Sequence, residues 1–164
     1  MTRTISILFA FITLSMSSCA QDENFDGMFQ RMTSGTVDVI TPDSLPTDGM
    51  VYLLDARELE EFEISHIPGA QHIGYDDFSM DNVKHIPRDA TVIVYCSVGY
   101  RSEKIGENLQ EAGYGDIYNL YGGIFHWVNT GNEVENDEGE KTEKVHTYNK
   151  KWSKWLERGE KVYE

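Results

Sequence analysis

Short apolar runs alternate with amphipathic segments through the middle of the chain. Runs of strand length lie at residues 37–40, 50–55, 70–73, 91–95 and 116–120. The run at 91–95 is continuously apolar and rich in β-branched residues, which is typical of a strand buried on both faces. Helical patterns fall between the runs, at 58–64, from about Arg101 to Gly113, and from Gly122 onward. This alternation predicts an α/β domain with a mainly parallel sheet.

The two flanks of this region have their own patterns. Phe25, Met28, Phe29 and Met32 lie on one face of a predicted helix that packs against the domain. After the domain, polar turn residues at 137–139 predict a hairpin within 132–146. An aromatic stripe then predicts an amphipathic helix docked on the domain, and its members are Tyr148, Trp152, Trp155 and Leu156. The alternative is an aromatic surface for a partner or for the bilayer interface.

The first residues have the features of an export signal. Arg3 precedes an apolar stretch of 12 residues, 5–16, which is too short to cross a hydrocarbon core of roughly 30 Å. Ser17-Ser18-Cys19 follows and resembles a loose lipobox. We therefore expect cleavage after Ser18, lipidation of Cys19 and export as a membrane-anchored lipoprotein of the bacterial cell envelope. The alternative is ordinary cleavage after Ala20.

These patterns divide the chain into four parts. Residues 1–18 are the predicted lipoprotein signal peptide, and 19–36 are a tether with the N-terminal helix. Residues 37–130 form the α/β domain, and 131–164 form the C-terminal hairpin and helix extension. A length of 164 residues suits one such domain.

Charge excludes one class of partner. The formal net charge is −14, so the chain lacks the clustered lysine and arginine with which proteins bind a nucleic-acid backbone. The same charge opposes adsorption to an anionic membrane, so attachment to a bilayer requires an anchor such as the lipid on Cys19. No nucleic-acid partner is therefore expected.

Cysteine usage directs attention to a single thiol. If Cys19 is acylated, Cys96 is the one remaining cysteine and has no partner for an intrachain disulfide. Cys96 directly follows the 91–95 strand and opens the segment Cys96-Ser97-Val98-Gly99-Tyr100-Arg101-Ser102, which leads into a helix. A helix N-terminus offers main-chain N–H groups and partial positive charge, and Arg101 offers a planar set of donors. Such a loop favours the thiolate and any other anion formed on the sulfur.

Several motifs in order resemble the rhodanese (thiosulfate sulfurtransferase) family, in particular its single-domain members. They are Leu54-Asp55-Ala56-Arg57-Glu58 with Glu61-Phe62, His66-Ile67-Pro68-Gly69-Ala70, Val94 to Ser102, Gly113-Tyr114, and Leu120-Tyr121-Gly122-Gly123-Ile124 with Trp127. The resemblance covers about residues 37–130. It implies a three-layer fold with a parallel sheet of about five strands flanked by helices, and a catalytic cysteine in the loop after a central strand.

The resemblance also implies a role for individual residues. Cys96 would be the nucleophile that holds a sulfane sulfur as a persulfide. Arg101 and Arg57 would supply positive charge for the donor, and Asp55 would orient the loop or Arg57, unless it caps a helix. Loop amides would cradle the terminal sulfur, and these belong to Ser97, Val98, Gly99, Tyr100 and Ser102.

The implied mechanism is a double displacement without a cofactor. The Cys96 thiolate attacks the outer sulfur of an anionic donor, thiosulfate or a polysulfide or persulfide, and an acceptor nucleophile then removes that sulfur. The acceptor is a thiol or a small cyanide-like nucleophile, and a protein thiol is one such acceptor. Many relatives that prefer thiosulfate carry arginine where this chain has Ser97. No metal is expected, because the five histidines show no ligand spacing.

Two other functions compete with sulfur transfer. Phosphatases and arsenate reductases of similar fold also use a Cys…Arg loop, but one residue longer; here four residues separate Cys96 from Arg101, which suits a single sulfur atom better. A non-catalytic module that senses sulfur or redox state is the second rival. Such modules usually lose the cysteine or the loop arginine, whereas this chain retains both.

Overall fold

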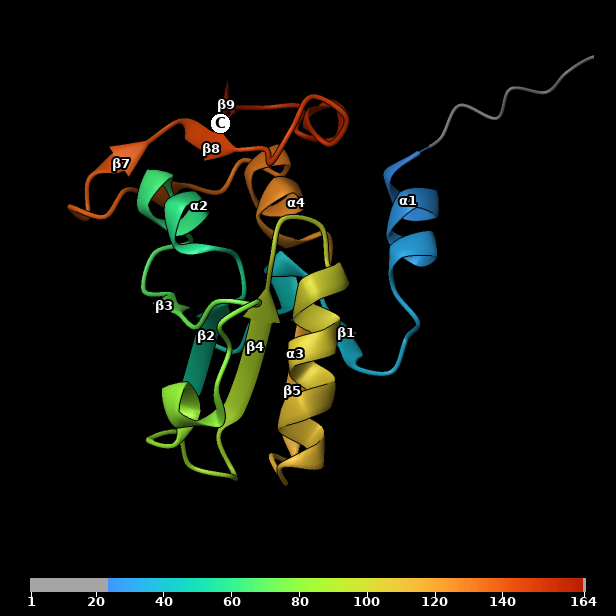
Figure 1. Ribbon diagram of the computed structural model, residues 1–164, viewed down its shortest axis with the longest axis vertical. Helices are drawn as coiled ribbons and strands as arrows, with labels where there is room; N and C mark the ends of the chain where they lie inside the picture. The colour runs from blue at the N-terminus through green and yellow to red at the C-terminus, as the bar shows by residue number, and fades with distance from the viewer. Residues whose placement is uncertain (1–23, 164) are drawn as a thin grey trace, which may run out of the picture.

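A parallel sheet of five strands forms the centre of the computed structural model, which describes residues 24–163 (Figure 1). The strand order is β1-β5-β4-β2-β3, so β4 lies in the middle. The bounds are β1 Asp38–Ile40, β2 Val51–Asp55, β3 Gln71–His72, β4 Thr91–Tyr95 and β5 Asp116–Leu120. The predicted fold class and all five predicted strands of the sheet are confirmed. The predicted signal peptide and Cys19 lie outside the described residues.

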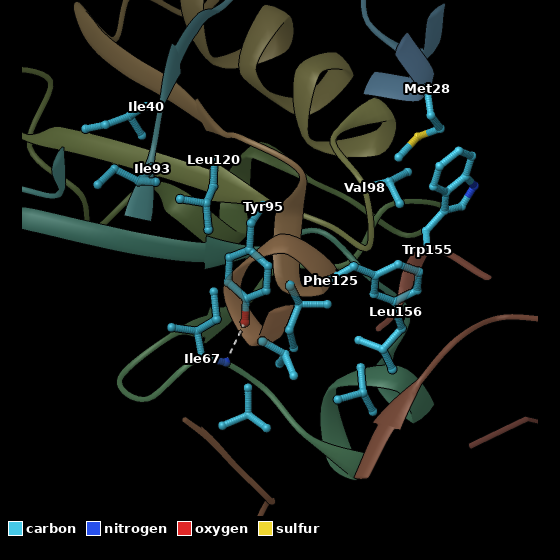
Figure 2. Close-up of a cluster of buried hydrophobic side chains, with 14 residues drawn as sticks. Met28, Ile40, Ile67, Ile93, Tyr95, Val98, Leu120, Phe125, Trp155 and Leu156 are labelled. Atoms are coloured by element: carbon cyan, nitrogen blue, oxygen red, sulfur yellow. Dashed lines mark hydrogen bonds between the residues drawn. The ribbon is translucent and has the colours of Figure 1, made fainter. Parts of the chain in front are cut away.

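Side chains of β4 alternate between the two faces of the sheet and so join two hydrophobic cores. Val92 and Val94 pack with the helix α3, Tyr100–Glu111, in one core. Ile93 and Tyr95 belong to the other core, which contains the helix α4, Gly123–Asn129 (Figure 2). Helices on both faces of a parallel sheet make the three expected layers, and both cores hold the carboxyl end of β4 rigidly in place.

Three further helical elements complete the domain. The helix α2, Leu59–Ile64, begins with a reciprocal capping box between Glu58 and Glu61. Short 3-10 turns lie at Pro42–Ser44 and Met80–Val83. No helix within residues 24–163 combines the length and the apolar character needed to cross a bilayer.

The predicted N-terminal helix is present and lies on the α4 side of the sheet. This helix, α1, spans Phe25–Met32, and Asn24 caps it by accepting the N–H of Gly27. Met28 is buried in the same core as α4. The carboxylate of Glu103, in the first turn of α3, accepts the main-chain N–H groups of residues 34–36 and so fixes α1 beside the loop that follows β4.

The C-terminal extension confirms the hairpin but not the helix. The antiparallel hairpin consists of β6 Val134–Glu135 and β7 Lys141–Thr142. Two further strands, β8 Lys144–His146 and β9 Glu160–Val162, pair in parallel. Between them the chain makes turns and one 3-10 helix, Ser153–Trp155, instead of the predicted amphipathic helix. In Figure 1 this extension crosses above the carboxyl ends of the strands, next to α2 and α4.

The predicted helix is wrong because side chains take the main-chain groups that a helix would pair internally. Tyr148 adopts a left-handed conformation, φ 62°, which interrupts any helix. The Asn129 amide oxygen accepts the N–H of Glu157, and its Nδ2 donates to the carbonyl of Trp155. Trp155 and Leu156 are nevertheless buried in the core with α4, so this part of the aromatic stripe docks as expected without a helix, whereas Tyr148 stays exposed.

Candidate active site

Cys96 lies at the carboxyl end of β4, where the chain turns into α3. The turn is short: Tyr100 is already the first residue of α3, and Gly99 precedes it with φ 118°. A Cβ atom at Gly99 would lie 2.6 Å from the ring of Phe29 in α1, so this position requires glycine for both conformation and space. The loop is therefore pressed between the sheet and α1.

The start of α4 holds the loop from the other side. The N–H of Ile124 donates to the Cys96 carbonyl at 2.9 Å, and the N–H of Phe125 donates to the Ser97 carbonyl at 3.2 Å. The carbonyl of one residue and the N–H of the next point in opposite directions across a trans peptide. The N–H groups of Ser97 and Val98 are therefore turned away from α4. Val98 anchors the loop by its side chain, which lies near Met28, Phe125 and Trp155 in Figure 2.

The Cys96 thiol has a main-chain donor of its own. Its Sγ accepts the N–H of Gly99 at 3.1 Å. The Ser102 hydroxyl lies 3.5 Å from Sγ, but it donates to Asn119 Oδ1 at 2.8 Å, and a hydroxyl has one proton to give. Asn119 Nδ2 in turn donates to the Gly99 carbonyl at 2.9 Å. Asn119 on β5 thus orients both groups that contact the sulfur.

Arg101 forms a partly buried ion pair with Glu61 across the site. Its Nη1 and Nη2 donate to the two carboxylate oxygens of Glu61 at 2.7 and 2.9 Å, and Nη2 also contacts Ser97 Oγ at 3.0 Å. Burial alone would raise the pKa of Glu61, but the hydrogen bonds and charge of Arg101 outweigh it, so this pKa lies below its ordinary value of 4.5. Burial likewise opposes the charge of Arg101, yet Glu61 keeps the pKa of Arg101 above its ordinary value.

Arg57 does not fit the role that the resemblance gave it. Its side chain is fully buried, and its Nε and Nη2 donate to the Asp55 carboxylate at distances down to 2.6 Å. Burial works against the charge, but Asp55 keeps the pKa of Arg57 above its ordinary value. Arg57 also donates to the Ser65 carbonyl and does not line the cavity at Cys96. Asp55 therefore orients Arg57 and caps no helix; the pair supports the sheet end beneath the site.

A cavity of about 320 Å³ opens above the thiol, although the whole Cys96 residue is only 1% exposed. The loop contributes Cys96, Ser97, Val98, Tyr100 and Arg101 to its lining. The remaining wall residues come from four other segments and are Met32, Glu58, Tyr75, Asp76, Tyr148 and Trp152. Residues 24–163 contain no cluster of three or more histidine, cysteine or carboxylate side chains suited to a metal ion.

The Cys96 thiol is buried at a strand–helix junction and lines a cavity. Comparison of the sequence with known protein families agrees with this arrangement. The rhodanese-like domain family matches residues 43–130, more than half of the chain. The protein is a member of the rhodanese-like domain family. Strand β1 precedes the matched region but forms part of the same sheet.

Relatives of this rhodanese-like protein carry sulfurtransferase names. A sulfurtransferase of Allochromatium vinosum is 34% identical over 89 residues, which cover 54% of this chain and 82% of that protein. The probable adenylyltransferase/sulfurtransferase MoeZ of Mycobacterium tuberculosis is 35% identical over 94 residues, 54% of this chain. The chain spans only 24% of the length of MoeZ. Sulfur transfer is thus supported at the level of the family.

Solved structures agree on the fold. A rhodanese-like domain protein from Staphylococcus aureus is 30% identical, with a TM-score of 0.53, and the match covers 61% of this chain and 98% of that one. A protein from Bacillus halodurans has a TM-score of 0.57 at 22% identity, covers 71% of this chain and 89% of its own, and shows the fold alone.

Some site residues of this rhodanese-like protein could not be assigned from the motifs. Glu61 stood in a quoted motif, but no signal indicated that it pairs with Arg101 across 40 positions. For Asn119, the one available signal was that a polar residue interrupts a predicted apolar strand. Met32, Tyr148 and Trp152 lie outside the region matched by the family, so their place in the cavity wall depends on the tertiary structure.

Proposed function

We propose that this protein is a sulfurtransferase that carries a sulfane sulfur on Cys96 and delivers it to a thiol or another small nucleophile. The observation that carries the proposal is the position of the Cys96 sulfur. It lies at a cavity, 3.1 Å from the N–H of Gly99, at the head of α3. Membership of the rhodanese-like family and the names of the relatives support this class of reaction.

The reaction runs in two displacements. The Cys96 thiolate attacks the outer sulfur of the donor, a new S–S bond forms, and the donor's own S–S bond breaks, so that its electron pair leaves with sulfite or a thiolate. An acceptor thiolate or cyanide then attacks the outer sulfur of the Cys96 persulfide and releases the Cys96 thiolate. Each step moves one sulfur and needs no cofactor.

The loop stabilises the anionic sulfur in both displacements. The Gly99 N–H already donates to Sγ, and the first N–H groups of α3 and the helix dipole lie at the same end. Arg101 acts mainly as a positioning residue, because Glu61 takes both of its terminal nitrogens while Ser97 is held between them. The same pairing opposes a phosphatase, which would need the guanidinium for a tetrahedral oxyanion.

The test is direct loading of the sulfur. We expect the purified protein to gain the mass of one sulfur atom on incubation with tetrasulfide or thiosulfate, and to lose it to cyanide with formation of thiocyanate. Intact-protein mass spectrometry measures both steps, and the Cys96→Ser variant should show neither. A wild-type protein that stays at its original mass with every donor would support the non-catalytic sensing module instead.

We also infer that the protein works outside the cytoplasm, anchored by a lipid on Cys19. The support is the apolar stretch at 5–16 followed by Ser17, Ser18 and Cys19. In a bacterial host, the mature protein should carry acyl chains at Cys19 and fractionate with membranes, while a Cys19→Ala variant should not. A wild-type protein cleaved after Ala20 and free of lipid would contradict this inference.

A further inference from the structure

The charges around the cavity do not suit a small dianion. Among the described residues that line it, Arg101 is the one lysine or arginine, and both its terminal nitrogens bind Glu61. Its Nη1 also lies 3.7 Å from Glu58. Glu58 and Asp76 add two carboxylates to the wall. The single cation is therefore outnumbered at the point where a donor must enter.

Two basic side chains near the loop are engaged by other groups. Lys104, one turn further along α3, has its Nζ 2.8 Å from the carboxylate of Glu107. His146 lies behind Glu61, with its Nδ1 3.8 Å away, and that nitrogen accepts the N–H of Tyr148 at 3.3 Å. Thiosulfate carries two negative charges and would meet lining residues in which the carboxylates outnumber the one cation, Arg101, whose terminal nitrogens already bind Glu61.

The rest of the wall is aromatic and apolar. Tyr75, Tyr100, Tyr148 and Trp152 line the cavity together with Met32. Aromatic faces attract organic groups and cations and offer little to an inorganic anion. A volume of about 320 Å³ falls within the range of about 300–1,000 Å³ that is typical of small-molecule pockets, so the cavity has room for more than a small ion.

Tyr148 indicates that this wall is adapted to a ligand. It is 53% exposed and is the non-glycine residue with a positive φ among residues 24–163. A large residue in this strained conformation, with half its surface in water, is typical of a functional position. It belongs to the C-terminal extension, outside the region matched by the family.

We propose that the sulfur donor is a low-molecular-weight organic hydropersulfide, RSSH, whose organic group R is uncharged or positively charged, and that Glu58 and Asp76 select against thiosulfate. This inference rests on the proposed function. The Cys96 thiolate forms a bond to the outer sulfur of RSSH, the donor S–S bond breaks, and RS⁻ leaves with the electron pair. Cys96 is left as the hydropersulfide, which retains the donor's proton, so atoms and charge balance.

The first experiment compares donors that differ in charge. The rate of sulfur loading on Cys96 is measured by mass spectrometry with cysteamine hydropersulfide, mercaptoacetate hydropersulfide and thiosulfate. We expect the cationic donor to load at least about tenfold faster than either anion in low salt, and the ratio to shrink in high salt because ions screen the wall.

Variants of the two carboxylates test whether they cause the preference for the cationic donor over thiosulfate. The double variant Glu58→Gln and Asp76→Asn should raise the thiosulfate rate about three- to tenfold relative to the cationic donor. Asp89→Asn is the matched control, because Asp89 precedes the amino end of β4, opposite to Cys96. That control should leave the ratio of the two rates unchanged.

A second measurement reads the charge of the cavity without any sulfur transfer. Cys96 is alkylated with iodoacetamide and with iodoacetate, and the ratio of the rates is compared with that of free cysteine. We expect the ratio to exceed that of free cysteine at least threefold. A ratio equal to that of free cysteine, or loading by thiosulfate as fast as by the cationic donor, overturns this inference and leaves the proposed function intact. Failure of every donor to load overturns both.

Discussion

At the scale of single residues, the site depends on how closely α4 approaches the loop. A Cβ atom at Gly123 would lie 2.1 Å from the Cys96 carbonyl oxygen. That carbonyl accepts the N–H of Ile124, the next residue in α4. Gly123 also has φ 56°, a conformation that costs other residues about 1–2 kcal/mol. The absence of a side chain at Gly123 is therefore what allows α4 to fix the peptide after Cys96.

Replacing Gly123 with alanine should damage stability and the site together. We expect Gly123→Ala to lower the free energy of unfolding by at least about 2 kcal/mol, from the strained φ and the contact with the carbonyl. Sulfur loading on Cys96 should fall about tenfold or more, because the loop must move. Urea unfolding and mass spectrometry measure the two effects. Gly115→Ala is the control, since a Cβ there meets nothing within 4 Å; equal behaviour of both variants would contradict the argument.

Single residues also show which parts of the site a sequence motif can predict. Local spacing was enough to select Cys96, Gly99 and Arg101 as candidates, because a nucleophile loop is a contiguous feature of the sequence. The direction in which a guanidinium points cannot be predicted from local spacing. Both Arg57 and Arg101 stand in the motifs as cations, yet Arg57 binds Asp55 and Arg101 binds Glu61. Only the packing of α2 against the loop decides that Arg101 meets Glu61 and that Arg57 is buried beneath the site.

At the scale of elements, the prediction of helices and strands succeeds where the periodic hydrophobic pattern is strong. The strands and helices of the domain are amphipathic or fully buried, so their periods identify them from the sequence. The extension 131–163 follows different physics. There the backbone conformation depends on the side chains of Asn129 and Asn149, which accept main-chain N–H groups, and on the left-handed conformation of Tyr148. The spacing of the aromatic residues reveals none of these interactions.

The link between α2 and α3 gives a prediction about acid. Glu61 has a lowered pKa, so its ionised form stabilises the fold above its ordinary value of 4.5, and that contribution is lost as the pH falls through the lower, folded-state value. Glu61→Gln should therefore be less stable than wild type at pH 7, by about 1–3 kcal/mol. The difference should shrink as the pH falls below 4.5 and through the lower, folded-state pKa of Glu61, because Glu61 then becomes neutral in wild type as well.

Thermal unfolding followed by circular dichroism across this pH range measures the effect. Glu60→Gln removes the same charge from the neighbouring, exposed position of α2 and should change stability little at any pH. If the gap between wild type and Glu61→Gln stayed constant from pH 7 to 3, the ion pair with Arg101 would not be its origin.

At the scale of the whole molecule, segments outside the family region complete the site. The helix α1 contributes Met32 to the cavity and Phe29 against Gly99. The C-terminal extension contributes Tyr148 and Trp152 to the wall, and its Trp155 and Leu156 are buried against the same core as α4 (Figure 2). The extension therefore couples the stability of the core to the shape of the cavity. A change at the buried residues that attach the extension to the core should affect both.

Leu156 is one of these buried residues, and truncating it should open the cavity without touching it. Its side chain is fully buried, so Leu156→Ala should reduce the free energy of unfolding by about 2–5 kcal/mol, from lost burial and the cavity left behind. Because the segment that carries Tyr148 and Trp152 is then less firmly docked, the rate at which iodoacetamide alkylates Cys96 should rise several-fold under native conditions. Glu157→Ala, at the adjacent exposed position, should alter neither urea unfolding nor alkylation. A Leu156→Ala variant that loses stability while Cys96 stays as protected as in wild type would show that the extension stabilises the domain but does not gate access to the thiol.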